Sequence, residues 1–171
     1  GVDDLGSLSS WTSQQFDPRL SWADVAWVKE RWGSDRLLIL KGIMDADDAR
    51  AAVAHGADAL IVSNHGGRQL DGAPSSIAAL PAIVDAVGKD IEVHMDGGVR
   101  SGQDVMRALC LGARGVYIGR PFLYGLGAGG EAGVTRAIEI LRKELDLTMA
   151  LCGERDIRNV GEHNLANRPW K

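Results

Sequence analysis

Short apolar runs alternate along most of the chain with longer segments whose apolar residues recur at helical spacing. Each run is rich in aliphatic and β-branched residues, as expected of a parallel strand that is buried on both faces. These predicted strands span 37–40, 59–62, 91–95 and 116–118. The helical spacing predicts helices over 22–32, 45–55, 76–87, 102–111 and 133–151. The alternation therefore predicts a parallel sheet with right-handed crossovers.

The two ends of the chain lack this alternation. Residues 1–20 are rich in Ser, Gly, Asp and Gln without a sustained period, so we expect a flexible loop segment there. Ser21 is a suitable N-cap for the helix that follows, and Gly33 marks the end of that helix. We therefore divide the chain into this loop, a strand–helix region over 21–155 and a C-terminal tail over 156–171.

Polar or glycine-rich residues follow every predicted strand at its carboxyl end. These segments are Lys41-Gly42, Ser63-Asn64-His65-Gly66, Asp96-Gly97-Gly98 and Gly119-Arg120. A closed barrel collects its active site at this edge from several strands, whereas an open doubly wound sheet concentrates ligands at one switch point. The distribution favours an α/β fold of the TIM (β/α)8 barrel type. A whole barrel needs roughly 250 residues, so these four βα units would form about half of one.

Two glycine-rich segments in the second half of the chain predict a phosphate site. Their candidate ligand residues are Asp96, Gly97, Gly98, Arg100, Gly119 and Arg120. Glycines let backbone N–H groups approach an anion, and each segment opens a helix, whose N-terminus favours negative charge. Arginine adds bidentate donors suited to phosphate oxygens. In the alternative interpretation, the glycines only form tight turns and the arginines are solvated.

A second candidate site follows the predicted strand at 59–62. His65 lies just beyond that strand, where a neutral imidazole can take a proton near pH 7, and Arg68 can grip a carboxylate at two points. A base and an anion clamp in one loop indicate a small acid as substrate. The residues alone equally allow a structural loop histidine and a surface arginine. For Lys41, a nucleophile, a fixed charge beside a cofactor and a snorkelling side chain all stay open.

Composition excludes several other classes of function. The 171 residues carry a net charge of −4, which disfavours a nucleic-acid-binding surface. The two cysteines, Cys110 and Cys152, form neither a metal-spaced pair nor a disulfide framework, so we expect a reducing cytoplasm. No apolar run approaches the length of a membrane span.

The remaining histidines and acidic residues have structural explanations. His55 falls in the last turn of a predicted helix, where a cation complements the helix dipole. His94 lies on a predicted strand, where a packed core role is favoured over a ligand role. Asp45 and its acidic neighbours are expected to cap a helix, and we predict no metal site.

These segments, in this order, closely resemble the FMN-dependent α-hydroxy acid oxidases and dehydrogenases, a family that includes glycolate oxidase, flavin-type L-lactate dehydrogenase and mandelate dehydrogenase. The similarity covers roughly residues 20–155. Its most specific part is the string Ser-Asn-His-Gly-Gly-Arg-Gln-Leu-Asp-Gly over residues 63–72. The resemblance implies that FMN is the cofactor and that region 21–155 is the C-terminal half of an FMN-binding barrel.

The resemblance also implies roles for matching residues. His65 would be the catalytic base and Arg68 the clamp for the substrate carboxylate. Lys41 would lie near the N1–O2 edge of the flavin, and Ser63 would hydrogen-bond the flavin ring. The ribityl phosphate would be held by Asp96, Gly97, Gly98, Arg100, Gly119 and Arg120.

The implied reaction is oxidation of an L-2-hydroxy acid to the 2-keto acid, with electrons passing to flavin N5. The implied partners are the N-terminal half of the barrel, on a separate chain or across a break in the loop, and further copies in a homotetramer. The implied location is the cytoplasm, or the periphery of the inner membrane where relatives carry an insertion in that loop. The alternatives are another FMN barrel, such as a glutamate-synthase-like enzyme or an isomerase, and a flavin- or phosphate-binding fragment without activity.

Overall fold

A four-stranded parallel sheet forms the centre of the computed structural model, which describes residues 4–15 and 17–166. Its strands are β1 (Ile39–Lys41), β2 (Ala59–Val62), β3 (Glu92–Met95) and β4 (Gly115–Val116), and they lie side by side in chain order. All four predicted strands are present. However, β1 begins two residues later than predicted, and β4 covers 115–116 rather than 116–118.

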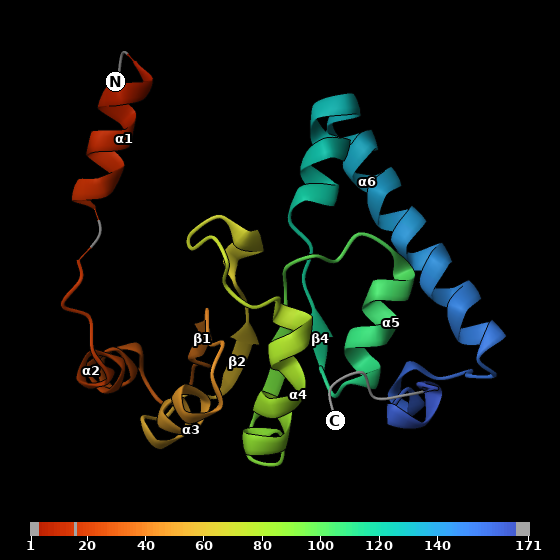
Figure 1. Cartoon of the computed structure of the whole chain (residues 1–171), viewed down its shortest axis with the longest axis horizontal. Helices are drawn as coiled ribbons and strands as arrows, with labels where there is room; N and C mark the ends of the chain where they lie inside the picture. The colour runs from red at the N-terminus through yellow and green to blue at the C-terminus, as the bar shows by residue number, and fades with distance from the viewer. Residues whose placement is uncertain (1–3, 16, 167–171) are drawn as a thin grey trace.

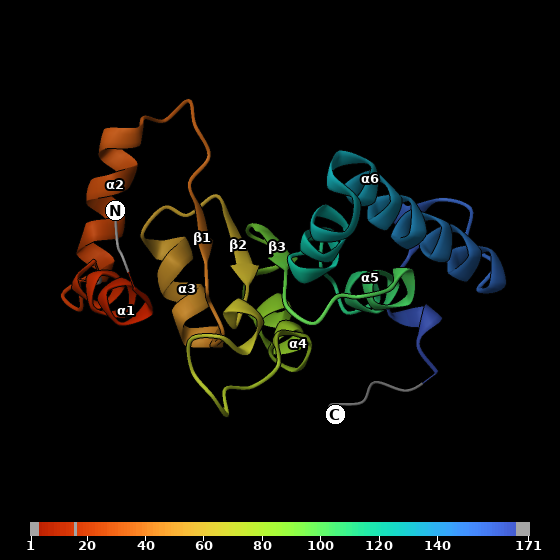
Figure 2. The same ribbon diagram turned by 90° about the horizontal axis from the view of Figure 1, so that it is seen from above.

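Helices follow the strands in the predicted alternation. They are α2 (Trp22–Trp32), α3 (Ala46–Ala54), α4 (Ser76–Val87) and α5 (Gly102–Cys110). The predicted caps are confirmed: Ser21 and Asp24 form a capping box on α2, and the Asp45 carboxylate accepts hydrogen bonds from Asp47 N and Asp48 N on α3. Figure 2 shows α3, α4 and α5 along one side of the strands.

The main core lies between the sheet and these helices. Alternate strand residues, including Leu60, Val62, Val93 and Met95, are buried against helix residues such as Leu80. The other strand residues point to the opposite face, because side chains alternate along a strand. Among the described residues, no helix covers that face. The expectation of strands buried on both faces is therefore wrong for β1, where Ile39 is 41% exposed.

A helix, α1 (Leu5–Gln14), replaces most of the loop predicted for residues 1–20. Its N-cap is Asp4, whose carboxylate accepts hydrogen bonds from Ser7 N and Ser7 Oγ at 2.8 Å each. In Figure 1, α1 extends away from α2 and the sheet. No helical period is visible there because the helix is mostly polar and exposed, and its capping residue supplies stabilisation.

The last helix is a hairpin rather than the single rod predicted from Gly133. The helical segment α6 (Arg120–Leu151) starts thirteen residues earlier and is interrupted at Gly129 and Gly130, where Gly130 has φ 58°. The two arms lie side by side in Figures 1 and 2. They touch through glycines, because a Cβ on Gly133 would lie 1.9 Å from Gly125 O. The sequence prediction missed the first arm because glycines lower helix propensity.

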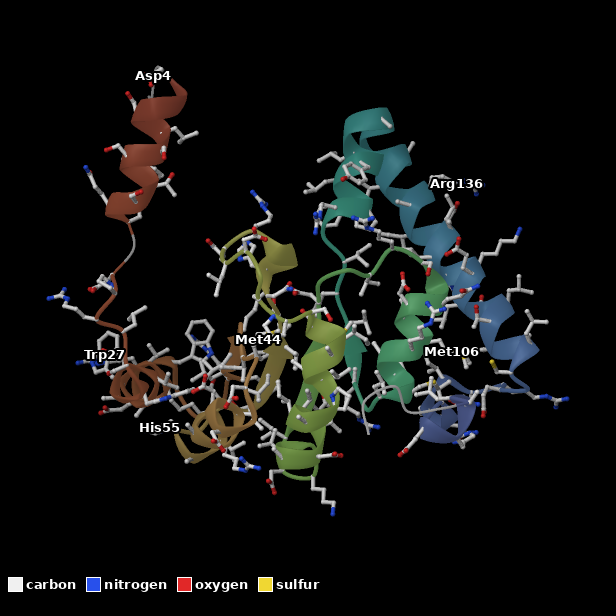
Figure 3. The ribbon with its side chains drawn as sticks, viewed as in Figure 1. Asp4, Trp27, Met44, His55, Met106 and Arg136 are labelled. Carbon is white, nitrogen blue, oxygen red and sulfur yellow. The ribbon has the colours of Figure 1, made fainter. Side chains whose placement is uncertain are left out.

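The C-terminal tail packs on the body of the chain. Met106, Cys110 and Met149 form a second core cluster, against which Val160 and Leu165 of the tail are packed. Figure 3 places Met106 on α5, on the side toward α6 and the tail. Both cysteines are free, and burial raises the pKa of the Cys110 thiol. Residues 167–171 of the predicted tail lie outside the described residues.

Asp58 joins α2 to the start of the sheet and makes a testable contribution to stability. Its carboxylate accepts a 2.6 Å hydrogen bond from Leu38 N and forms an ion pair with Lys29. Both contacts hold the pKa of Asp58 below its usual value. A carboxylate with a lowered folded pKa stabilises the fold above its unfolded pKa of roughly 3.9. That contribution disappears as the pH falls through the folded pKa.

We therefore expect Asp58→Asn to lower the free energy of unfolding by about 1 kcal/mol at pH 7. In urea titrations the difference from the native protein should vanish as the pH falls below about 4. Asp17→Asn removes an exposed Asp17–Arg19 pair and is the matched control, for which no comparable loss is expected. An Asp58 loss that persisted unchanged in acid would contradict the assignment.

Candidate functional site

The carboxyl ends of the strands gather the predicted site residues. The loop after β2 and the start of α6 both rise from this end of the sheet in Figure 1. Lys41 Nζ donates a 2.8 Å hydrogen bond to Ser63 Oγ and forms a 3.0 Å ion pair with Asp96 Oδ2. Residues from three neighbouring strands are thus joined through one ammonium group.

Strand register explains this junction. Lys41 pairs with Ile61, and Ile61 pairs with His94. Because side chains alternate, Ser63 and Asp96, each two residues further on, project from the same face as these residues. This is the face that α3, α4 and α5 leave uncovered. The site therefore lies on the side that is the interior of a closed barrel.

Asp96 retains one free acceptor. Its Oδ2 contacts Lys41, whereas its Oδ1 is buried and has no hydrogen-bond partner among the described residues. A buried carboxylate oxygen without a donor carries an energetic penalty, which a bound donor group would remove. The site is therefore prepared to accept a hydrogen bond from a ligand.

His65 begins a left-handed turn. The φ angles of His65, Gly66 and Gly67 are 56°, 66° and 73°, and His65 is the non-glycine residue with positive φ in the described chain. Such a conformation costs a non-glycine residue about 1–2 kcal/mol and concentrates at functional sites. The turn is held by surrounding contacts, including a 3.1 Å hydrogen bond from His65 N to Ser63 Oγ.

Arg120, the first residue of α6, reaches this turn from the other side. Its Nη2 donates a 2.9 Å hydrogen bond to Gly66 O. A hollow of about 200 Å³ lies beside it, lined by residues of all four strand ends, among them Lys41, His65 and Asp96. A Cβ on Gly98 or Gly119 would meet nothing within 4 Å, so the backbone at both positions is open to a ligand.

The loop after β3 is anchored by Asp104. Its Oδ2 accepts 3.0 Å hydrogen bonds from Arg100 N and Ser101 N. Burial alone raises the pKa of Asp104, but these hydrogen bonds outweigh the burial and leave the pKa below its usual value. The Arg100 side chain is exposed and lines the hollow. The loop therefore presents open backbone and a guanidinium, an arrangement that suits an anion.

Known proteins share this arrangement over nearly the whole chain. Residues 1–167 match a family described as FMN-dependent dehydrogenase. The chain belongs to the FMN-dependent dehydrogenase family. An L-lactate dehydrogenase from Caulobacter vibrioides is 51% identical over 164 residues, which cover 96% of this chain and 42% of that relative. The chain thus spans less than half the length of this curated relative.

Solved structures agree with that assignment. (S)-mandelate dehydrogenase, a monotopic membrane protein, is 38% identical with a TM-score of 0.88, over 98% of this chain and 44% of that one. A mandelate oxidase mutant with a monooxide FMN adduct is 44% identical with a TM-score of 0.79, over 85% of this chain and 46% of that one. The predicted fold class is confirmed: this FMN-dependent dehydrogenase chain corresponds to about half of a TIM barrel. Within the part that the structure describes, no helix has the length and apolar character to cross a membrane.

Most of the residues predicted for the FMN-dependent dehydrogenase site come together. Those that line the hollow are Lys41, His65, Asp96, Gly97, Gly98, Arg100, Gly119 and Arg120. Ser63 is buried beneath them and bonded to Lys41. Arg68 is the exception, because its side chain is exposed at the end of the left-handed turn and lines none of these surfaces.

Two other histidines, His55 and His94, do not line the hollow. His55 is the C-cap residue of α3, as expected, and its ring stacks on Trp22. His94 projects from the face opposite the helices, where its side chain is only 16% exposed, so the packed role favoured for it over a ligand role stays a prediction. There its Nε2 lies 3.1 Å from Glu92 Oε2, and its ring contacts Tyr117.

The sequence reasoning missed Asn64 and Ser76. Asn64 precedes His65, and its backbone N–H donates a 3.2 Å hydrogen bond to the buried Ser76 Oγ at the start of α4. Asn64 stood inside the most specific motif of the chain, but its amide suggested no chemistry of its own. An asparagine two residues before a glycine pair was the available signal, because its side chain readily bonds nearby backbone in turns.

Proposed function

We propose that the protein carrying this chain oxidises an L-2-hydroxy acid to the 2-keto acid with FMN as its cofactor. The observation that carries the proposal is that His65, in its left-handed conformation, lines the same hollow as the Lys41–Asp96 ion pair. Beside them lies an open anion cradle, formed by the backbone at Gly98 and Gly119 and the side chains of Arg100 and Arg120. An imidazole, a fixed ammonium and an anion site within one hollow fit a base, a flavin partner and a phosphate site. The family and its L-lactate dehydrogenase and mandelate dehydrogenase members support this choice.

The residues present fit FMN. The buried, unpartnered Oδ1 of Asp96 suits a hydroxyl of the ribityl chain. The open backbone at Gly98 and Gly119, with Arg100 and Arg120, suits the phosphate. Gly97 supplies the positive φ of 89° that turns this loop. FMN, when bound, takes up the two electrons that the hydroxy acid loses.

The side chains of this chain then have distinct tasks. An imidazole nitrogen of His65 takes one proton from the hydroxy acid as it is oxidised. Lys41, held by Ser63 and Asp96, would place its positive charge at the electron-accepting ring and would favour the reduced form of that ring. Arg68 binds the substrate carboxylate, and its exposure allows its side chain to turn toward the site.

The N-terminal half of the barrel completes this site in our proposal. The uncovered face of the sheet and the unpaired edges of β1 and β4 match the place of four further strands. Relatives of about twice this length support the same arrangement. The homotetramer and the cytoplasmic or membrane-peripheral location stay predictions.

The test is to add L- and D-2-hydroxy acids to the purified native protein without oxygen and to record the visible flavin absorbance. We expect an L-acid to bleach the flavin and its D-isomer to leave it unchanged. Lactate and mandelate are the first acids to compare, together with glycolate as an achiral reference. A bound flavin that no hydroxy acid reduces would instead favour another FMN barrel, and a colourless protein would overturn the assignment of FMN.

A further inference from the structure

We propose that Asn64 is a positioning residue that holds the base His65 in its left-handed conformation. The inference rests on the proposed function, because it concerns how the proton acceptor of that reaction is placed. Asn64 need not contact substrate or cofactor for this role. It acts on the turn over residues 64–67 and on the loop that continues to Pro74.

The Asn64 carboxamide bonds the turn on both sides. Its Oδ1 accepts a 3.2 Å hydrogen bond from Gly67 N, and its Nδ2 donates a 3.1 Å hydrogen bond to Pro74 O. The first bond closes the turn around His65, alongside a 3.0 Å backbone bond from Gly67 N to Asn64 O. The second ties the far end of the loop to its start. One side chain therefore fixes both ends of the segment that carries His65 and Arg68.

The position of Asn64 is itself fixed. Asn64 N donates to Ser76 Oγ, which is buried at the start of α4. A Cβ on Gly97 would lie 3.1 Å from Asn64 Oδ1 and 2.9 Å from Ser76 Oγ, so the loop after β3 packs directly against this group. Asn64 is thus set between the turn of the base and the loop of the anion cradle.

The turn needs such support because His65 does not favour positive φ. The glycines at 66 and 67 adopt the left-handed region without cost, whereas an L side chain does not. His65 N and Gly66 O are held by Ser63 and Arg120, which belong to the proposed flavin site. Among the described residues, Asn64 supplies a further side-chain contact to the turn, and it does not line the hollow of about 200 Å³. Loss of its bonds should let His65 relax toward ordinary φ and move its imidazole away from the substrate.

The experiment compares Asn64→Ala with Asn164→Ala in the native holoprotein. Asn164 is a matched control because its Oδ1 accepts from Gly161 N and its Nδ2 donates to Glu154 Oε1, each at 3.0 Å, far from the site in sequence. The first readout is the anaerobic rate of flavin reduction per bound flavin. We expect Asn64→Ala to lower this rate by about tenfold to a hundredfold, as for a base displaced by about 1 Å, with the flavin content retained.

Asn64→Asp keeps an acceptor for Gly67 N and loses the donor to Pro74 O. It should recover part of the rate lost in Asn64→Ala, because the turn is closed again. The second readout uses no substrate: amide hydrogen exchange of the 63–74 segment in the protein without flavin. Exchange at Gly67 should be roughly threefold to tenfold faster in Asn64→Ala and unchanged in Asn164→Ala.

Each outcome has one meaning. A native protein that hydroxy acids do not reduce would contradict the proposed function, while the exchange measurement would still test the turn. Normal reduction in Asn64→Ala at full flavin content would overturn the positioning role. A merely structural role would lower flavin content or thermal stability and leave the rate per bound flavin unchanged, and that result would also overturn it.

Discussion

Replacing His65 with alanine is expected to leave FMN bound and to slow its reduction by a hydroxy acid by about 10²–10⁴-fold, the usual contribution of a general base. In the proposed site, the cofactor contacts would come mainly from other residues of the hollow, such as Lys41, Asp96 and Arg120, so the flavin content should persist. The measurement is stopped-flow absorbance of the flavin after mixing with the acid that bleaches the native protein.

A second substitution separates the base from the backbone. Asparagine tolerates the left-handed region better than other non-glycine residues, so His65→Asn preserves the turn without the imidazole. It should be as slow as His65→Ala. His163→Ala is the control, since His163 is exposed in the tail and pairs with Glu154. A His65 variant that reduced its flavin at a near-native rate would remove His65 from the mechanism.

Gly102→Ala is expected to destabilise the fold by about 3 kcal/mol, at the upper end of overpacking effects. A Cβ at this position would lie 2.0 Å from Leu145 N and 2.6 Å from Leu141 O, so α5 and α6 would have to separate. That separation would also weaken the 2.9 Å hydrogen bond from Gly102 N to Glu144 Oε2. The loss is measured as the free energy of unfolding in urea.

Gly127→Ala is the matched control for this effect. Gly127 lies in the first arm of α6, and a Cβ there would meet nothing within 4 Å. Alanine is the better helix former, so the control should be neutral or slightly more stable than the native protein. Equal stability of Gly102→Ala and the native protein would mean that the two helices are not packed as closely as described.

The sequence predicted the elements whose burial leaves a periodic trace. The helices at 22–32 and 76–87 match in both ends, because each presents a regular pattern with a clear cap or boundary. It failed at α1 and at the first arm of α6, where a polar surface and repeated glycines erase that pattern. Local sequence carries little information on helices whose apolar residues do not recur at helical spacing or that pack through backbone contact.

In the candidate site, too, the local sequence identified residues but not the contacts between distant parts of the chain. The strand-end rule placed Lys41, Ser63 and Asp96 at one edge, but the ion pair between the first and last of them depends on strand register across three strands. The contact of Arg120 with Gly66 depends on the geometry of a hairpin that the sequence did not reveal. Residue chemistry identified candidates, whereas partners separated by many residues required the fold.

The chain order of the four strands has a consequence for biosynthesis. Each strand pairs with the one made immediately before it, as Ile39 with Ala59 and His94 with Gly115, so one α-helix separates successive partners. Shorter loops lose less entropy on closure than longer ones, so pairing with the preceding strand costs less than pairing with a distant strand. The sheet can therefore grow strand by strand as the ribosome delivers the chain, with each new helix covering its strand before the next one emerges.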